Sequence, residues 1–176
     1  RFIAKTKYVF EGVEYTREYF ASYPDHVIVV HFSASKPGMI SFNAAMTTPH
    51  RNNYLSSDGN TLVYDVTVNA IKFQNRMNVV ADGGTVDLNN GKINVSGANS
   101  ATLILTTATN FNSFEDVTGN PGLRASAIMA QIEGKSYERI LEDHLKDYQS
   151  LFNRVRWDLC EAHESAGDIT TYRVRN

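Results

Sequence analysis

The stretch that decides the fold is VEYTREYFASYPDHVIVVHFSASKPG, residues 13–38. Its beginning alternates, so that Val13, Tyr15, Arg17 and Tyr19 face one side and Glu14, Thr16, Glu18 and Phe20 face the other. Residues 27–34 are rich in β-branched side chains, which predicts a strand covered on both faces. Tyr23-Pro24-Asp25 and Lys36-Pro37-Gly38 interrupt these runs, and we predict that both connect successive antiparallel strands.

The same kind of pattern continues along most of the chain. Turn signals at Glu11-Gly12, Asp82-Gly83-Gly84 and Asn90-Gly91 separate short apolar or alternating runs. The polar segment TTPHRNNYLSSDG, residues 47–59, is the longest predicted loop. These signals predict roughly nine strands in an antiparallel β-sandwich. The predicted strands are 4–10, 13–20, 27–34, 39–46, 61–68, 71–80, 85–89, 92–98 and 102–109.

The hydrophobic period changes after residue 115, and two helices are expected. Asn120 and Pro121 predict the N-cap and first position of one helix, which Gly134 is expected to end. Ser136 predicts the N-cap of a second helix that runs to about Val155. Its apolar residues recur every three or four positions, and Arg139 with Asp143 forms an i,i+4 pair. The stripe is wide enough that we expect Tyr137, Leu141, Tyr148 and Phe152 to be packed against something. The fold class is therefore mainly β with C-terminal helices.

Composition limits the classes of function. Hydrophobic residues make up 42% of the 176 residues, and the net charge of −2 gives no basic surplus for binding nucleic acid. The single cysteine, Cys160, excludes an intramolecular disulfide and a CxxC metal site. No apolar run approaches the roughly 18 residues of a membrane span. The chain begins at Arg1, without a visible signal peptide, and we expect its natural N-terminus to lie upstream.

Glu115 and Asp116 are the first candidates for acid–base chemistry, because glycosidases use two carboxyl groups on opposite sides of a sugar. Adjacent acids in a polar loop are more often solvated, and we favour that interpretation. No nucleophile elbow, phosphate-binding loop or dinucleotide-binding turn is present. The sequence therefore assigns no catalytic, cofactor-binding or metal-binding residue, and no cofactor is expected.

Other polar and aromatic residues have an ordinary structural interpretation beside a functional one. The histidines show no metal-ligand spacing, and His144 is more typical of a core or interface position, near Asp147. Ser22 and Ser33 lack the context of a catalytic triad, and Cys160, near Trp157, is more typical of a packed thiol than of a nucleophile. Tyr54 and Tyr64 have rings that can stack on sugars, but most aromatic residues in such strands belong to the core. The five histidines are His26, His31, His50, His144 and His163.

The segment GVEYTREYFASYPDHVIVVHFSASKPGMISF, residues 12–42, resembles the N-terminal β-domain of glycoside hydrolase family 95, the α-L-fucosidase family. The likeness rests on Val13, Tyr15, Arg17, Glu18, Phe20, Ala21, Ser22, Pro24 and Asp25, followed by Lys36-Pro37-Gly38. Residues 79–111 resemble later strands of that domain. Residues 136–159 resemble its following helix, with His144, Asp147, Tyr148, Leu151, Phe152 and Arg154 in order. The resemblance extends over about residues 8–159.

The resemblance implies the non-catalytic N-terminal portion of a bacterial, inverting glycoside hydrolase that removes terminal α-L-fucose or α-L-galactose from oligosaccharides. It implies part of a two-sheet supersandwich over 1–115, a helical linker over 116–159, and an irregular tail, 160–176, that leads to an (α/α)₆ barrel. The family's catalytic residues lie in that barrel. The implied partners are the oligosaccharide substrate and the barrel, and the implied location is periplasmic or extracellular.

Two expectations remain beside this one. A stand-alone carbohydrate-binding or adhesin-like β-sandwich is the alternative function, although such a module has no need for a long amphipathic helix. The wide apolar stripe of the second helix and open sheet edges also lead us to expect that the chain by itself forms a homo-oligomer.

Overall fold

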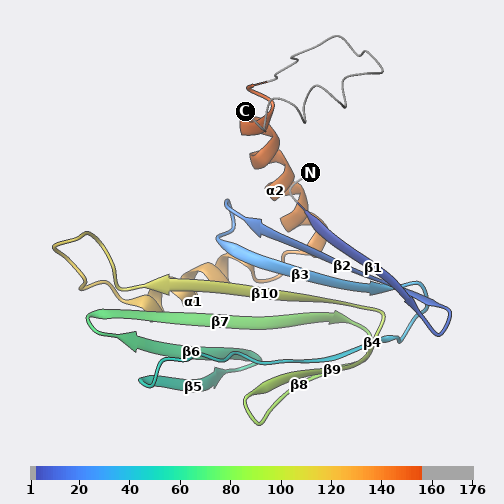
Figure 1. The fold of residues 1–176 in the computed structure, drawn as a ribbon, viewed down its shortest axis with the longest axis horizontal. Coiled ribbons are helices and arrows are strands. Elements are labelled where there is room, and N and C mark those ends of the chain that lie inside the picture. The colour runs from blue at the N-terminus through green and yellow to red at the C-terminus, as the bar shows by residue number, and fades with distance from the viewer. Residues whose placement is uncertain (1–2, 156–176) are drawn as a thin grey trace, which may run out of the picture.

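The computed structural model describes residues 3–155, and their strands form two antiparallel sheets followed by two helices (Figure 1). The predicted fold class is confirmed. The larger sheet has the order β1-β2-β3-β10-β7-β6-β5, and the smaller has the order β4-β9-β8. The strands are β1 Ala4–Phe10, β2 Val13–Ser22, β3 Val27–Ala34, β4 Ile40–Ala44, β5 Asn53–Asp58, β6 Thr61–Val68, β7 Ile71–Asp82, β8 Thr85–Asn89, β9 Lys92–Ala98 and β10 Ser100–Thr109.

The hairpin of β2 and β3 forms as the sequence predicts. Ser22 pairs with Val27 and Tyr15 pairs with Ala34, and the amide of His26 donates to the carbonyl of Tyr23 across the turn. The prediction that β3 is covered on both faces is wrong, because Ile28 remains 48% exposed. The core between the sheets does not include Ile28, so the three-stranded sheet leaves this part of the seven-stranded sheet open.

The turn at Lys36-Pro37-Gly38 has a different role from the one predicted. It carries the chain out of the larger sheet, and β4 pairs with β9 in the smaller sheet instead of with β3. Gly38 has a φ of 72°, a conformation that costs other residues strain, and its amide donates to Oδ1 of Asn99 at 3.0 Å. The turn chemistry was therefore predicted correctly, but the partner of the strand that follows it was not.

The polar segment at 47–59 is not a continuous loop. Residues 53–58 form β5, which pairs with β6 at the edge of the larger sheet. Almost all of its side chains are exposed, so the strand carries no hydrophobic alternation. Its backbone hydrogen bonds to a regular neighbour are sufficient to hold it at the edge.

Two hydrophobic cores lie on opposite faces of the larger sheet. The first fills the space between the sheets, and its fully buried members include Leu62, Ile93 and Ala98. The second lies between the larger sheet and the helices, and it contains Phe20, Val27, Val29, Ile104, Ile132 and Ile140. Alternate residues of β2 and β3 therefore enter different cores, as expected for a sheet with material on both faces.

The helices are α1, Pro121–Ile132, and α2, Tyr137–Phe152. Both predicted N-caps are confirmed, since Asn120 accepts from the amide of Leu123 and Ser136 accepts from the amide of Arg139. Gly134, with a φ of 77°, lies just beyond the end of α1. The helix α1 contacts β10 and β7, whereas α2 contacts β2 and then extends away from the sheet (Figure 1). Neither helix has the length and apolar character that crossing a bilayer requires, as far as the described residues go.

Candidate functional site

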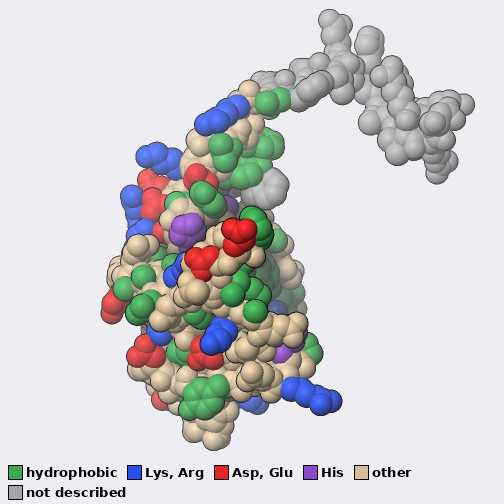
Figure 2. Space-filling view, turned by 90° about the vertical axis from the view of Figure 1, so that its left-hand side faces the viewer, with side chains coloured by type: hydrophobic (Ala, Val, Ile, Leu, Met, Phe, Trp, Pro, Cys, Tyr) green, Lys and Arg blue, Asp and Glu red, His purple; other side chains and the backbone are tan. Residues whose placement is uncertain are grey.

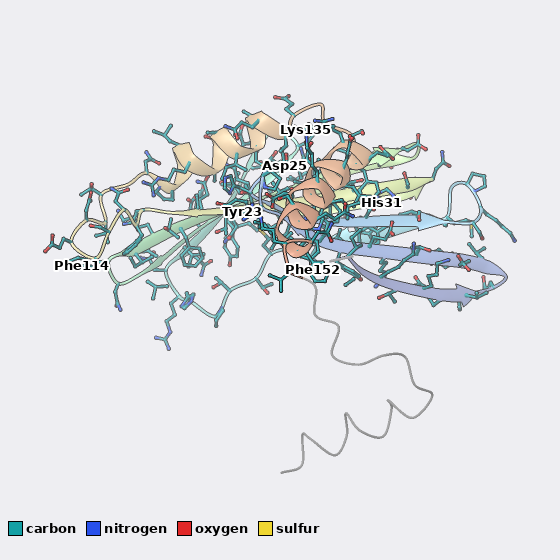
Figure 3. The ribbon with its side chains drawn as sticks, turned by 90° about the horizontal axis from the view of Figure 1, so that it is seen from above. Tyr23, Asp25, His31, Phe114, Lys135 and Phe152 are labelled. Carbon is teal, nitrogen blue, oxygen red and sulfur yellow. The ribbon has the colours of Figure 1, made fainter. Side chains whose placement is uncertain are left out.

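The described part of the chain concentrates its buried polar side chains where the helices meet the larger sheet. We call this region the junction, and it consists of Glu18, Phe20, Ser22, Asp25, His31, Thr102, Lys135, Tyr137, Arg139, Asp143 and His144. Figure 3 places Asp25 and Lys135 beside the base of α2, with His31 on another side of the helix. The turn after β2, the loop between the helices and α2 itself all contribute side chains to it.

A charged chain runs through one side of the junction. The carboxylate of Asp25 is only 2% exposed, and it accepts from Oγ of Ser22 and from Nζ of Lys135, each at 2.6 Å. Lys135 also lies 3.4 Å from Asp143, whose other oxygen lies 2.9 Å from Arg139. The Asp25 carboxylate, through its hydrogen bond and charge, raises the pKa of Lys135 above its usual value. Lys135 therefore stays charged, and its contacts link the turn, the loop and the helix.

An aromatic group lies on another side of the junction. The rings of His31 and Tyr137 stack with centroids 3.8 Å apart, and Nδ1 of His31 is 2.9 Å from Oγ1 of Thr102. The hydroxyl of Tyr137 donates to Glu18 at 2.9 Å. Burial lowers the pKa of His31 against the opposing charges of Glu18 and Glu138, and burial together with the Glu18 contact raises the pKa of Tyr137. Both rings are therefore neutral near pH 7.

Glu18 completes this aromatic group. Burial alone pushes the pKa of its carboxyl up, but hydrogen bonds from Lys5 and Tyr137, with the charge of Lys5, outweigh burial and lower the pKa overall. Lys5 lies 3.0 Å from the carboxylate. The carboxylate is therefore an acceptor that fixes the position of Tyr137.

A series of stacked rings leads from the sheet along α2. Phe20 stacks on His144 at 4.9 Å, Tyr148 follows at 6.4 Å from His144, and Phe152 follows at 5.3 Å from Tyr148. His144 is buried, so the expected core position is confirmed. Leu151, Phe152 and Val155 are exposed, and Figure 2 shows hydrophobic side chains gathered on one flank of α2 with charged side chains along the other. The apolar stripe therefore continues beyond the part that the sheet covers.

Glu115 and Asp116 lie in the loop between β10 and α1, away from the junction. Asp116 accepts from the hydroxyl of Thr118 at 2.6 Å, from its amide at 2.8 Å, and from Asn112 at 2.8 Å. These bonds lower the pKa of Asp116. Glu115 is exposed, and Figure 3 shows its neighbour Phe114 at the far tip of the loop. Asp116 thus stabilises the loop and Glu115 is exposed on it. The two carboxylates do not face each other across a space that would hold a sugar.

Side chains on both sides of that loop hold its base. Asn110 is buried and donates to the carbonyls of Ala70 and Val117, while Arg124 donates to the carbonyl of Phe111 at 2.9 Å and contacts Asn112. Phe114 is 88% exposed at the tip. The loop is therefore an ordered projection whose aromatic tip has no cover within residues 3–155.

The other residues singled out in the sequence are dispersed. His26 is exposed in the turn after β2, and His50 lies near Phe73. Ser33 is paired within the larger sheet, and Ser22 belongs to the junction. Tyr64 is buried and donates to Asn53, whereas Tyr54 is exposed on β5. Trp157, Cys160 and His163 lie outside the described residues. Within residues 3–155 no three His, Cys, Asp or Glu side chains are grouped as metal ligands.

Sequence reasoning missed the pairing of Asp25 with Lys135. The two residues are 110 positions apart, and Asp25 was attributed to turn chemistry alone. Its spacing of three from Ser22 is the one local signal, since the hydroxyl and carboxylate at that separation bond within the turn. The contact of His31 with Tyr137 likewise joins β3 to α2 and has no local signal.

Residues 2–114 match the family model described as glycosyl hydrolase family 65, N-terminal domain. Among curated proteins, the chain is 32% identical to alpha-L-fucosidase 2 of Arabidopsis thaliana over 87% of its own length. It is 31% identical over 88% of its length to an Aspergillus niger protein assigned as alpha-fucosidase A. In both comparisons the chain spans 22% of the relative's length.

A solved structure shares the fold. It is a protein from the human microbiome that has been assigned as a kojibiose phosphorylase, and it aligns with a TM-score of 0.56 over 85% of this chain and 23% of that one. Its sequence identity is 11%, so this likeness concerns the fold alone.

Proposed function

Because this chain belongs to the family described as glycosyl hydrolase family 65, N-terminal domain, we propose that it is the non-catalytic N-terminal portion of an α-L-fucosidase-like glycoside hydrolase. The proposal includes membership of family 95 and removal of terminal α-L-fucose, or α-L-galactose, from oligosaccharides. It also includes an inverting mechanism, a bacterial source and a periplasmic or extracellular location. The observation that carries it is the alignment of nearly the whole chain to a fifth of each of two fucosidases.

The junction supports this role better than a role in chemistry. Its carboxylates, Asp25, Glu18 and Asp143, are each bonded to lysine, arginine or tyrosine, and none faces a second acid with room for a sugar and a water. What the junction does is hold an amphipathic helix against a β-sheet. Such a helix, with its outer stripe exposed, suits the start of a connection to a further domain.

The test compares the chain with a full-length protein that contains it. The full-length protein is expected to release fucose from a chromogenic α-L-fucoside, while the chain alone gives only background. Because an inverting enzyme turns an α-linked substrate into a β product, proton NMR is expected to detect β-L-fucose first. Glu115→Gln and Asp116→Asn in the full-length protein are expected to leave the rate unchanged.

Three results would contradict the proposal. Turnover by the purified chain that disappears with Glu115→Gln would place catalysis in this domain. An α-configured first product would show retention. Release that requires inorganic phosphate and yields a sugar phosphate would make the parent a phosphorylase, as its solved structural neighbour has been assigned to be. A stand-alone binding module would instead bind fucosylated oligosaccharides as the isolated chain, which calorimetry would detect.

A further inference from the structure

A small patch of contact holds α2 on the sheet. Among its described residues only Ile140 and His144 are buried, and both lie in the first half of the helix. In the second half of the helix no residue is buried, and Leu151 and Phe152 are exposed. The direction in which α2 leaves the sheet is therefore set by its first two turns and by the loop that precedes it.

Hydrophobic contact alone does not define that direction well, because the attraction between apolar surfaces is not directional. Ile140 is fully buried, but hydrophobic burial of this kind is a non-directional contribution. Ion pairs and hydrogen bonds at fixed distances define a rotation more narrowly, as buried polar groups do in some coiled coils. The polar contacts on either side of Ile140 are therefore the ones that select an orientation.

These contacts lie symmetrically about Ile140. At about 100° of rotation per residue, Tyr137 and Asp143 fall about 60° to either side of it. Tyr137 is bonded to Glu18 of β2, and Asp143 contacts Lys135, which pairs with Asp25 in the turn after β2. The helix is thus tethered to the sheet on both flanks of its buried edge.

Asp25 is the most deeply buried member of these ion pairs, so it depends most on its partner Lys135. A carboxylate that is 2% exposed loses most of its hydration, so losing its cation leaves a buried charge at high cost. Lys135 is 33% exposed and supplies that cation from the loop between α1 and α2. The loop cannot move far without separating the pair, and Ser22 holds the other carboxylate oxygen in place.

We propose that Asp25 is a positioning residue that, through Lys135 and Asp143, fixes the orientation of α2 relative to the larger sheet. Through α2 it sets how the β-domain is placed against the domain that follows, and this second part rests on the proposed function. Asp25 touches no substrate in this role. Its effect on a reaction is to hold two domains in one arrangement.

Orientation is measured directly by residual dipolar couplings of backbone amides in the 176-residue chain. In the unmodified protein one alignment tensor is expected to fit the couplings of both the larger sheet and α2. In Asp25→Asn and in Lys135→Met the sheet couplings are expected to stay as they were. Those of α2 are expected to fall to about half, as for a helix that samples a wide range of directions.

Two controls separate positioning from general stability. Lys146→Met removes an exposed lysine from α2 itself and is expected to leave the couplings unchanged. Lys135→Arg keeps the cation and is expected to restore most of the coupling size. A variant that merely weakens the fold would lower the unfolding midpoint without changing the couplings of the folded protein.

The proposal is overturned if one tensor fits sheet and α2 equally well in both Asp25→Asn and Lys135→Met. It is also overturned if α2 needs its own tensor in the unmodified chain. Should Asp25→Asn fail to fold, the pair of variants Lys135→Met and Lys135→Arg decides, because the Lys135 side chain is only partly buried. These couplings need no activity, so a failed fucosidase assay would leave the positioning result standing and would reject only its consequence for the enzyme.

Discussion

Replacing Gly84 by alanine tests how closely the turn between β7 and β8 packs against the backbone of β9. Gly84 has a φ of 66°, and a Cβ placed there would collide with the carbonyl oxygen of Ser96 and would lie 2.6 Å from the amide nitrogen of Ala98. Both atoms are backbone of β9, which is paired on both sides and has little freedom to withdraw. Gly84→Ala therefore combines a strained backbone conformation with a collision against fixed atoms.

The matched control is Gly12→Ala. Gly12 has a φ of 71°, and nothing lies within 4 Å of its added Cβ, so this variant isolates the cost of the left-handed conformation. That cost is about 1–2 kcal/mol for an ordinary residue. Overpacking against a rigid neighbour adds about 1–3 kcal/mol. We expect Gly84→Ala to lose more free energy of unfolding than Gly12→Ala by this second amount.

Urea unfolding at 25 °C, followed by circular dichroism, gives the two free energies of unfolding. The comparison holds when the slopes with denaturant agree, because equal slopes indicate equal surface exposed on unfolding. Losses that agree within about 0.5 kcal/mol, the usual limit for surface substitutions, would mean that β9 moves aside at little cost. The reasoning from the close approach would then be refuted.

Three further outcomes are expected. The free energy of unfolding should fall as the pH drops below about 6.5, the usual pKa of histidine, because His31 binds a proton in the unfolded chain and its burial lowers its pKa in the folded one. In His31→Phe the urea midpoint at pH 5.5 should lie closer to the midpoint at pH 7.5 than it does in the unmodified chain. An unchanged difference between the two midpoints would exclude His31 as its source. Ile140→Ala should cost about 2–5 kcal/mol in thermal or urea unfolding, since its side chain is fully buried, and a loss below 1 kcal/mol would show that the site collapses. The isolated chain should form a dimer or larger assembly through the exposed stripe of α2 or open sheet edges, and a monomer by light scattering at high micromolar concentration would contradict this.

Local signals were sufficient for most elements of the fold. Helix caps at Asn120 and Ser136 depend on side chains that bond within three residues, so their positions could be predicted from spacing alone. The β2–β3 hairpin could be predicted for the same reason, because its turn and its alternation lie within one short segment. Short-range chemistry thus determines where elements begin and end.

Pairing across sheets could not be predicted in this way. The turn at Gly38 has the same composition whether the next strand joins its neighbour or crosses to another sheet, and the choice depends on β9, more than fifty residues later. The edge strand β5 was missed because an exposed edge needs no apolar alternation, so its residues resemble a loop. A hydrophobic pattern predicts which residues of a strand are buried, so it gives no signal for a strand whose side chains are exposed.

The junction shows the same limit for functional residues. Asp25 was assigned only to a turn, and no pattern in the sequence singles out its partner Lys135. The significance of each appears only when the chain brings them to 2.6 Å. The prediction of a buried His144 succeeded because it needed only the apolar periodicity of one helix.

Because α2 is long, a small tilt at its base moves its far end by a larger distance. Its 16 residues, at about 1.5 Å of rise each, make a rod of about 24 Å that is held at one end. By simple geometry, a tilt of about 5° at the base displaces the tip of such a rod by about 2 Å. A misplacement of about 1 Å at a reacting centre can lower a rate by about a hundredfold. If α2 leads to the catalytic domain, a substitution at Asp25, in the turn after β2, changes the rate by moving the far end of the helix.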